Sequence, residues 1–262
     1  MTNSNAKPTY SLFTGLLLLA LACLSFVSLC SLVMNWCLKS DFVKQAGLTA
    51  LLFAVGLFAL VWQIWRTSRY TRQLLKYAHI PLPPHLEAFV TEFGLDVSQI
   101  TLIQSSKPIA FCFGFLRPRI CLSTGLMELL SVPQLQAALL HEDHHRRRFD
   151  PLRILIVEAL GAALFFLPVV QEWRLLYKIQ LELDADNYAA DKAGKAALAG
   201  ALHRLLSFSP GSASGVVTAG LSANSARIAA LLGERSTPQQ ISTRSFLSSA
   251  VILWLICLLL ML

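Results

Sequence analysis

The stretch His141-Glu142-Asp143-His144-His145 contains the pattern HExxH, which constrains the fold more than any other part of the chain. In an α-helix, side chains four residues apart lie on one face, so His141 and His145 can offer imidazole nitrogens to one metal ion. A zinc ion held in this way leaves a position open for water, and Glu142 beside it can take up a proton from that water. The pattern therefore predicts a helix with a hydrolytic zinc site on one face.

The residues around the motif predict where its helix begins and ends. Ser131 can cap the helix, and Gln134 three residues later completes a capping-box pattern. We expect the helix to run to about Phe149. Asp150-Pro151 then marks a second helix start, with the aspartate as its cap and the proline in its first turn.

A catalytic zinc site needs a third protein ligand, and five acidic residues after the motif are candidates. They are Glu158, Glu172, Glu182, Asp184 and Asp186. Residues 152–167 can form a helix that leads away from the motif, Pro168 interrupts it, and residues 171–190 can form a helix that leads back. At about 1.5 Å per residue the two legs roughly match in length, so Glu182 returns to the histidines while the other two glutamates stay farther away.

Asp186 lies one helical turn after Glu182, on the same face of the expected helix. There it can accept a hydrogen bond from the outer ring nitrogen of a ligand histidine and fix the tautomer of that ring. His141 is the favoured partner. His144 occupies a position that the motif leaves free, and we assign it no ligand role.

Apolar runs outside the motif predict a membrane protein. Of the 262 residues, 55% are hydrophobic and only 14% are charged, and the mean hydropathy is +0.58. A soluble domain usually carries about 25% charged residues. Three runs are long enough to cross a bilayer, at roughly twenty residues per span. They are Ser11 to about Met34, Ala46 to about Trp65, and Phe246 to Leu262.

The sequence thus predicts an α-helical membrane protein with a small α+β zincin-like metalloprotease domain of the gluzincin HExxH type. We expect two transmembrane helices in residues 1–65, a cytoplasm-facing metallopeptidase domain in residues 66–245, and a C-terminal transmembrane helix in residues 246–262. Within the domain, residues 152–190 form an apolar hairpin that is re-entrant or interfacial. The Ser-, Gly- and Ala-rich residues 207–226 form a flexible linker.

Basic residues determine the expected orientation. Four of them directly follow the second apolar run, whereas the loop before it carries Lys39 and Lys44. By the positive-inside rule, the N-terminus and the metal motif both face the cytoplasm. The net charge of +7 arises from residues that flank apolar segments, so we expect no direct binding of nucleic acid. The four basic residues are Arg66, Arg69, Arg72 and Lys76.

Three strand-like runs precede the motif, over residues 99–104, 109–113 and 119–123. An exposed strand edge near the metal of a zinc peptidase can hold an extended substrate backbone by strand addition. We take the second run with its following glycine as the candidate substrate strand. A core hairpin with the two phenylalanines packed inside is an alternative that is compatible with it. The candidate residues are Ile109, Ala110, Phe111, Cys112, Phe113 and Gly114.

Three segments together resemble a known family. They are Phe113-Gly114-Phe115-Leu116-Arg117-Pro118-Arg119-Ile120, then Leu139-Leu140-His141-Glu142-x-x-His145 with Arg147 and Asp150-Pro151-Leu152, and Glu182-x-x-Ala185-Asp186. From residue 45 to about residue 235 the chain resembles the BlaR/MecR-type integral membrane zinc metallopeptidases. The HtpX-type quality-control proteases share the HExxH and ExxxD elements. The resemblance implies His141, His145 and Glu182 as ligands of one zinc ion per chain, and Glu142 as general base.

The resemblance also implies a function. We expect a zinc endopeptidase in the bacterial inner (cytoplasmic) membrane that cleaves a regulatory protein, such as a transcriptional repressor, or its own linker. The chain ends at Leu262 without the penicillin-binding sensor of the signalling members, so we expect no beta-lactam sensing. A quality-control protease and a non-proteolytic membrane scaffold or signal relay stay open as alternatives. The expected partners are a protein or peptide substrate and the lipid bilayer, and homo-oligomer formation stays open.

Overall fold

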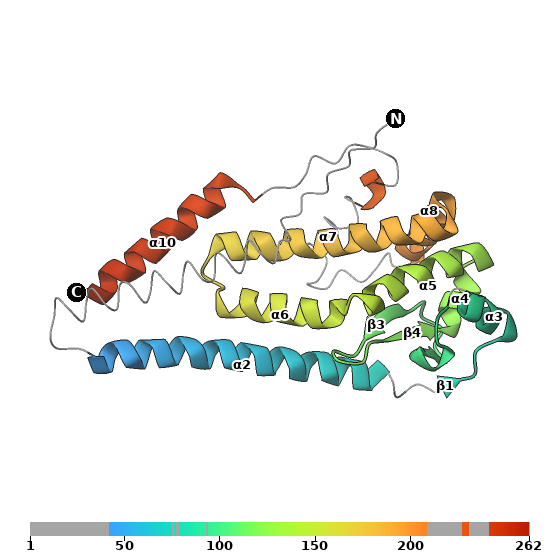
Figure 1. Cartoon of the computed structure of the whole chain (residues 1–262), viewed down its shortest axis with the longest axis horizontal. Coiled ribbons are helices and arrows are strands. Elements are labelled where there is room, and N and C mark those ends of the chain that lie inside the picture. Colours follow the sequence, from blue (N-terminus) through green and yellow to red (C-terminus); the bar gives the residue numbers. More distant parts are fainter. Residues whose placement is uncertain are drawn as a thin grey trace.

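The computed structural model describes residues 42–74, 76, 79–92, 94–208, 227–230 and 241–261. The first predicted apolar run, residues 11–34, and residues 209–226 of the predicted linker lie outside these ranges. The described chain is mostly helical with a small sheet (Figure 1). Its elements are α2 (Phe42–Leu74), β1 (His79–Ile80), α3 (Pro84–Glu92), η1 (Val97–Gln99), β2 (Ile100–Ile103), β3 (Ala110–Phe113), β4 (Arg119–Ser123), α4 (Thr124–Leu129), α5 (Val132–Arg147), α6 (Asp150–Ala163), α7 (Pro168–Ala193), α8 (Lys195–Phe208) and α10 (Thr243–Met261).

The four strands form one mixed sheet in the order β1-β2-β4-β3. Strands β2 and β4 are parallel, whereas β1 pairs with β2 and β3 pairs with β4 in the antiparallel direction. The three strand-like runs in the sequence are confirmed as β2, β3 and β4. Because β3 is the last strand in this order, one of its edges has no partner strand among the described residues.

The turn between β3 and β4 requires a glycine. Gly114 has a φ of +89°, and a Cβ atom there would lie 2.6 Å from the carbonyl oxygen of Arg117. Any other residue would strain this turn. The turn fixes the register in which Phe113 pairs with Arg119 and Ala110 pairs with Leu122. The position of the β3 edge therefore depends on this glycine.

The helices pack on the sheet and extend beyond it. Helix α5 packs against β3 and β4 and also against α7 and α8. Helix α6 follows α5 directly and packs against both α2 and α7, so three long helices run side by side (Figure 1). Helix α10 packs against α7. This arrangement places α5 between the sheet and the returning helix α7.

The main hydrophobic core lies where α5 meets the sheet, α3 and α8. Burial of a Leu or Ile side chain contributes roughly 1.5–3 kcal/mol. Several such residues are completely buried here, which holds the N-terminal half of α5 firmly on the sheet. They include Ile120, Leu122, Leu126, Leu139 and Leu140. A smaller cluster of Leu167, Val169 and Val170 joins the turn between α6 and α7 to α10.

Polar contacts hold α6 and α7 together as a hairpin. Nη1 of Arg174 donates to Oε2 of Glu158 at 3.1 Å, and Nζ of Lys178 contacts the other oxygen of this carboxylate. The side-chain amide of Gln171 donates to the carbonyl oxygen of Gly161 at 2.8 Å. The carboxylate of Glu158 thus has its polar partners within the hairpin.

The prediction of membrane-spanning helices is wrong for the described residues. A helix that crosses a bilayer needs about 20 consecutive, mainly apolar residues. Across the ranges that the structure describes, none of the helices is both long and apolar enough for such a crossing. Helix α2 ends in a stretch that carries Arg66, Arg69 and Arg72, and α10 begins with Thr243 and Arg244. The predicted fold class is corrected accordingly: the described residues form a mostly helical fold with a small mixed sheet.

Candidate metal centre

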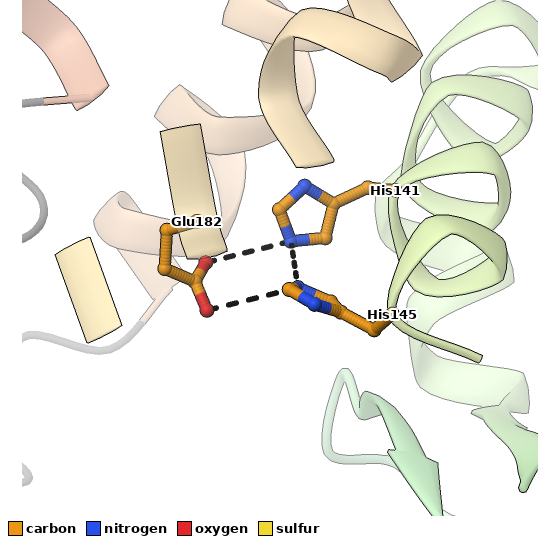
Figure 2. A group of neighbouring side chains, drawn as sticks. All are labelled: His141, His145 and Glu182. Atoms are coloured by element: carbon orange, nitrogen blue, oxygen red, sulfur yellow. Dashed lines mark hydrogen bonds and ion pairs between the residues drawn. The ribbon is translucent and has the colours of Figure 1, made fainter. Parts of the chain in front are cut away.

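Helix α5 brings His141 and His145 to one face, as their spacing requires (Figure 2). Each residue is only 7% exposed. Their Nε2 atoms lie 3.2 Å apart, and the planes of the two rings are nearly perpendicular. Two buried ring nitrogens that face each other, each able to present a lone pair, form a suitable place for a shared cation.

Helix α7 carries Glu182 to the same place. Oε2 of Glu182 lies 3.4 Å from Nε2 of His141, and Oε1 lies 3.7 Å from Nε2 of His145 (Figure 2). One ligand atom from each of the three residues lies within 4.8 Å of the other two. Two imidazoles and one carboxylate are the protein ligands of a common type of catalytic zinc site. Within the described ranges, these three residues are the group that could hold a metal ion.

The other candidate ligands are directed elsewhere. The carboxylate of Glu172 accepts hydrogen bonds from the backbone N–H and the hydroxyl group of Ser242 at 3.1 and 3.0 Å. Glu158 is bound within the α6–α7 hairpin. His144 packs against Tyr188, with ring centroids 5.1 Å apart. Neither of these glutamates nor His144 belongs to the group that could hold a metal.

An aspartate lies at Nδ1 of both His141 and His145, the ring nitrogen that is not directed at Glu182. Oδ2 of Asp150 is 2.8 Å from Nδ1 of His145, and Oδ1 of Asp186 is 3.0 Å from Nδ1 of His141. Both carboxylates are almost completely buried. The contact of His145 is an aligned hydrogen bond, whereas Nδ1 of His141 is close to its aspartate without such alignment. An ionised carboxylate only accepts hydrogen bonds, so Nδ1 carries the hydrogen and Nε2 can present its lone pair.

The ionisation of His141 and that of Glu182 depend on each other in the metal-free protein. Burial lowers the pKa of His141, but the close carboxylates of Asp186 and Glu182 outweigh burial and raise this pKa to about 9. Burial raises the pKa of Glu182, but the hydrogen bond to His141 and the charge of Arg227 outweigh burial and lower this pKa to about 2. The imidazolium form of His141 and the carboxylate form of Glu182 therefore stabilise each other.

Glu142 lines a cavity of about 760 Å³. The three grouped residues line the same cavity. Glu142 is half-buried and is not one of the grouped residues. A carboxylate beside the ligand set, but outside it, can exchange protons with a molecule in the cavity.

Strand β3 forms part of the cavity wall. Five of the six predicted substrate-strand residues, Ala110 to Gly114, line the cavity, whereas Ile109 does not. The carbonyl oxygen of Ile109 accepts a hydrogen bond from the backbone N–H of Ser123 at 3.0 Å. The backbone N–H of Ile109 donates to the hydroxyl group of Ser123 at 2.8 Å. Phe111 and Phe113 pack together with ring centroids 5.7 Å apart. The edge of β3 thus borders the cavity, while Ile109 holds the start of the strand in place.

The interpretation of Asp150 as a helix cap is wrong. The residue that caps α6 is Phe149, whose φ of 56° lies in the left-handed region, and Asp150 is the first helical residue. The Asp150 carboxylate contacts His145 and Arg153 instead. The sequence does contain a signal for the contact of Asp150 with His145. This signal is an acidic residue five positions after a ligand histidine, at a place where the helix has to break.

Arg227 is a second site residue that the sequence did not identify. It lines the cavity and contacts the carboxylates of Asp186 and Glu182. It lies 41 residues after Asp186, and residues 209–226 between them fall outside the described ranges. No local pattern links positions so far apart.

Comparison with known families identifies the chain by its sequence. The profile of a family described as BlaR1 peptidase M56 matches residues 34–198, more than half of the chain. The chain belongs to the BlaR1 peptidase M56 family. This match confirms the resemblance described above, and membership of M56 implies a metallopeptidase. The matched M56 range contains all three grouped residues and ends before Arg227. A comparison with curated proteins gave no match.

Proposed function

We propose that this M56 protein is a zinc-dependent endopeptidase in which His141, His145 and Glu182 bind the metal and Glu142 is the general base. The observation that carries the proposal is the convergence of the three ligand atoms within 4.8 Å at a cavity that Glu142 also lines. Two imidazoles and one carboxylate fit zinc, and they leave a fourth position open. Membership of M56 supports hydrolysis of peptide bonds as the reaction.

Each residue of the site would have its own role in this reaction. Zinc, when bound, would polarise the carbonyl group of the peptide bond and make a water molecule more acidic. Glu142 would accept the proton of the attacking water and pass it to the departing amine. Asp150 and Asp186, at the outer nitrogens of the histidines, would keep both Nε2 atoms directed to the metal. The edge of β3 would pair with the backbone of an extended substrate.

The proposed substrate is a protein or peptide in extended form. Aromatic side chains of β3, Phe111 and Phe113, and the apolar residues Leu202 and Leu205 of α8 line the cavity, which favours apolar substrate side chains. We propose regulatory proteolysis of a dedicated protein, such as a transcriptional repressor. Cleavage of one bond in one protein, rather than of many unfolded chains, would separate this role from quality control. From family membership, we propose a site of action at the bacterial inner membrane. The proposal that the metal centre faces the cytoplasm rests only on the basic residues that follow the second apolar run.

Zinc content and peptidase activity test the proposed function directly. We expect the purified protein to contain about one zinc ion per chain, as in other sites with this ligand set. Removal of zinc with a chelator should abolish cleavage of a fluorescence-quenched mixed peptide library, and added zinc should restore cleavage. His145→Ala should lose zinc and activity. His203→Ala is the matched control, because His203 is exposed on α8. A protein without zinc or cleavage would favour the scaffold instead.

Zinc affinity should depend on pH through His141. The pKa of this residue in the metal-free protein is raised from 6.5 to about 9, so its contribution to metal-free stability is present below pH 6.5 and is lost as the pH rises through about 9. Zinc needs the deprotonated ring, so the opposite sign holds for binding. We expect affinity to rise about tenfold per pH unit up to about pH 9 and then to level off. Chelator competition at several pH values measures this slope, and an affinity independent of pH would exclude His141 as a ligand.

A further inference from the structure

Arg227 joins two carboxylates of the metal centre. Its Nε and Nη2 atoms donate to Oδ2 and Oδ1 of Asp186 at 2.7 and 2.8 Å, and its Nη1 atom lies 3.2 Å from Oε2 of Glu182. Only 15% of the Arg227 side chain and 5% of the Asp186 side chain are exposed. A buried bidentate pair of this kind has a defined geometry. Arg227 therefore holds both acids in one orientation.

The two acids that Arg227 contacts are also the two acids beside His141. Asp186 lies at Nδ1 of the ring, and Glu182 lies at Nε2. Arg227 thus acts, through these carboxylates, on both nitrogens of one ligand histidine. Groups that hold the outer nitrogen of a ligand histidine fix the orientation of its ring.

The charges of the centre also favour an arginine at this position. The carboxylates of Glu142, Glu182, Asp150 and Asp186 surround the two histidines, and Arg227 contacts Asp186 and Glu182, whereas Arg153 contacts Asp150. Without Arg227, the buried carboxylate of Asp186 would lose its charged partner, and an uncompensated buried charge is strongly unfavourable.

A second arginine–aspartate pair on the same helix provides a contrast. Nη1 of Arg148 contacts Oδ2 of Asp184 at 3.3 Å, and Asp184 lies two residues after Glu182 on α7. The side chains of Arg148 and Asp184 are 42% and 30% exposed. An exposed pair with a single contact contributes little to stability. Arg148 is therefore a matched control for Arg227.

We propose that Arg227 is a positioning residue of the metal centre, which orients Asp186 towards His141 and holds Glu182 in its ligand position. This inference rests on the proposed zinc site. It also means that the centre needs Arg227, which lies beyond the range that the M56 profile matches.

The experiment compares the full-length parent protein with Arg227→Gln, Arg227→Lys and Arg148→Gln. Zinc affinity is measured by competition with a chromophoric chelator, and the geometry of the centre by the visible absorption of bound cobalt(II). We expect Arg227→Gln to weaken zinc binding by about 10- to 100-fold and to change the cobalt spectrum, as when other outer partners of metal ligands are lost. Arg227→Lys keeps the charge but not the forked geometry, so its affinity should be intermediate. Arg148→Gln should match the parent.

Thermal unfolding of the metal-free proteins establishes which variants fold. A folded Arg227→Gln variant with parental zinc affinity and an unchanged cobalt spectrum would overturn the proposal. If this variant does not fold, Arg227→Lys decides: a reduced affinity supports the positioning role, and parental affinity overturns it. A parent protein that binds no zinc would overturn the proposed function itself, which distinguishes that failure from a failure of the role of Arg227.

Discussion

Replacement of Glu142 by glutamine should reduce peptide hydrolysis by about 10²- to 10⁴-fold, the usual contribution of a general base. Glutamine keeps the shape of the side chain but cannot accept the proton of the attacking water. Zinc should stay bound, because Glu142 is not one of the three residues whose ligand atoms converge. The measurement combines the zinc content of the purified variant with its kcat on a quenched peptide that the parent protein cleaves.

Glu128→Gln is the matched control for this exchange, because Glu128 is an exposed glutamate on α4. It should leave both zinc content and kcat at parental values. A zinc-loaded Glu142→Gln variant that is as active as the parent would show that Glu142 is not the base. Loss of zinc together with activity would show that Glu142 helps to hold the metal.

Replacement of Glu182 by alanine should weaken zinc binding by at least about 100-fold. Loss of an outer partner of a metal ligand weakens binding by up to about 100-fold, and loss of a ligand itself should weaken it at least as much. The variant would keep only two histidines, whereas catalytic zinc sites use three protein ligands. The fold should persist, because the Glu182 side chain is 31% exposed and Asp186 still holds Arg227. Chelator competition gives the affinity, and thermal unfolding of the metal-free variant tests the fold.

Glu172→Gln is the control for the third ligand. Glu172 lies on the same helix, and its carboxylate binds Ser242 rather than the histidines. This variant should keep parental zinc affinity. If Glu172→Gln lost zinc while Glu182→Ala kept it, the proposed ligand set would be wrong.

Local patterns account for the parts of the centre that lie within one helix. The spacing of His141 and His145 places both on one face of α5, because an α-helix has 3.6 residues per turn. The start of α5 is local as well, and the N–H of Ser131 donates to Oε1 of Gln134 at 3.1 Å. Strands β2, β3 and β4 are also predicted from local patterns, because each is a short apolar run between turn residues.

The approach of Glu182 to the histidines is a tertiary feature, yet the lengths of the helices restrict it. The sequence predicts a break at Pro168, and α7 begins at Pro168. The returning helix then brings Oε2 of Glu182 to 3.4 Å from Nε2 of His141. A hairpin of two helices has few ways to place a given residue, so counting residues along both legs selects Glu182 over Glu158 and Glu172.

Features that depend on distant parts of the chain could not be predicted in this way. Asp150 before a proline is a local cap signal, but the left-handed conformation of Phe149 moves the cap by one residue. Arg227 meets Asp186 from 41 residues away, and no periodic pattern relates them. The apolar runs predicted membrane-spanning helices, and the helices in the described ranges do not meet the length and apolarity that a span needs.

The residues of the metal centre lie on α5, on α7 and in the segment 227–230, and this distribution sets the order in which they are synthesised. Synthesis adds roughly 5–20 residues per second from the N-terminus. His141 and His145 therefore emerge first, Glu182 follows them, and Arg227 comes last. A nascent chain that ends after α5 presents two histidines without their carboxylate. We therefore expect metal loading to follow closure of the α6–α7 hairpin, as a late step of maturation.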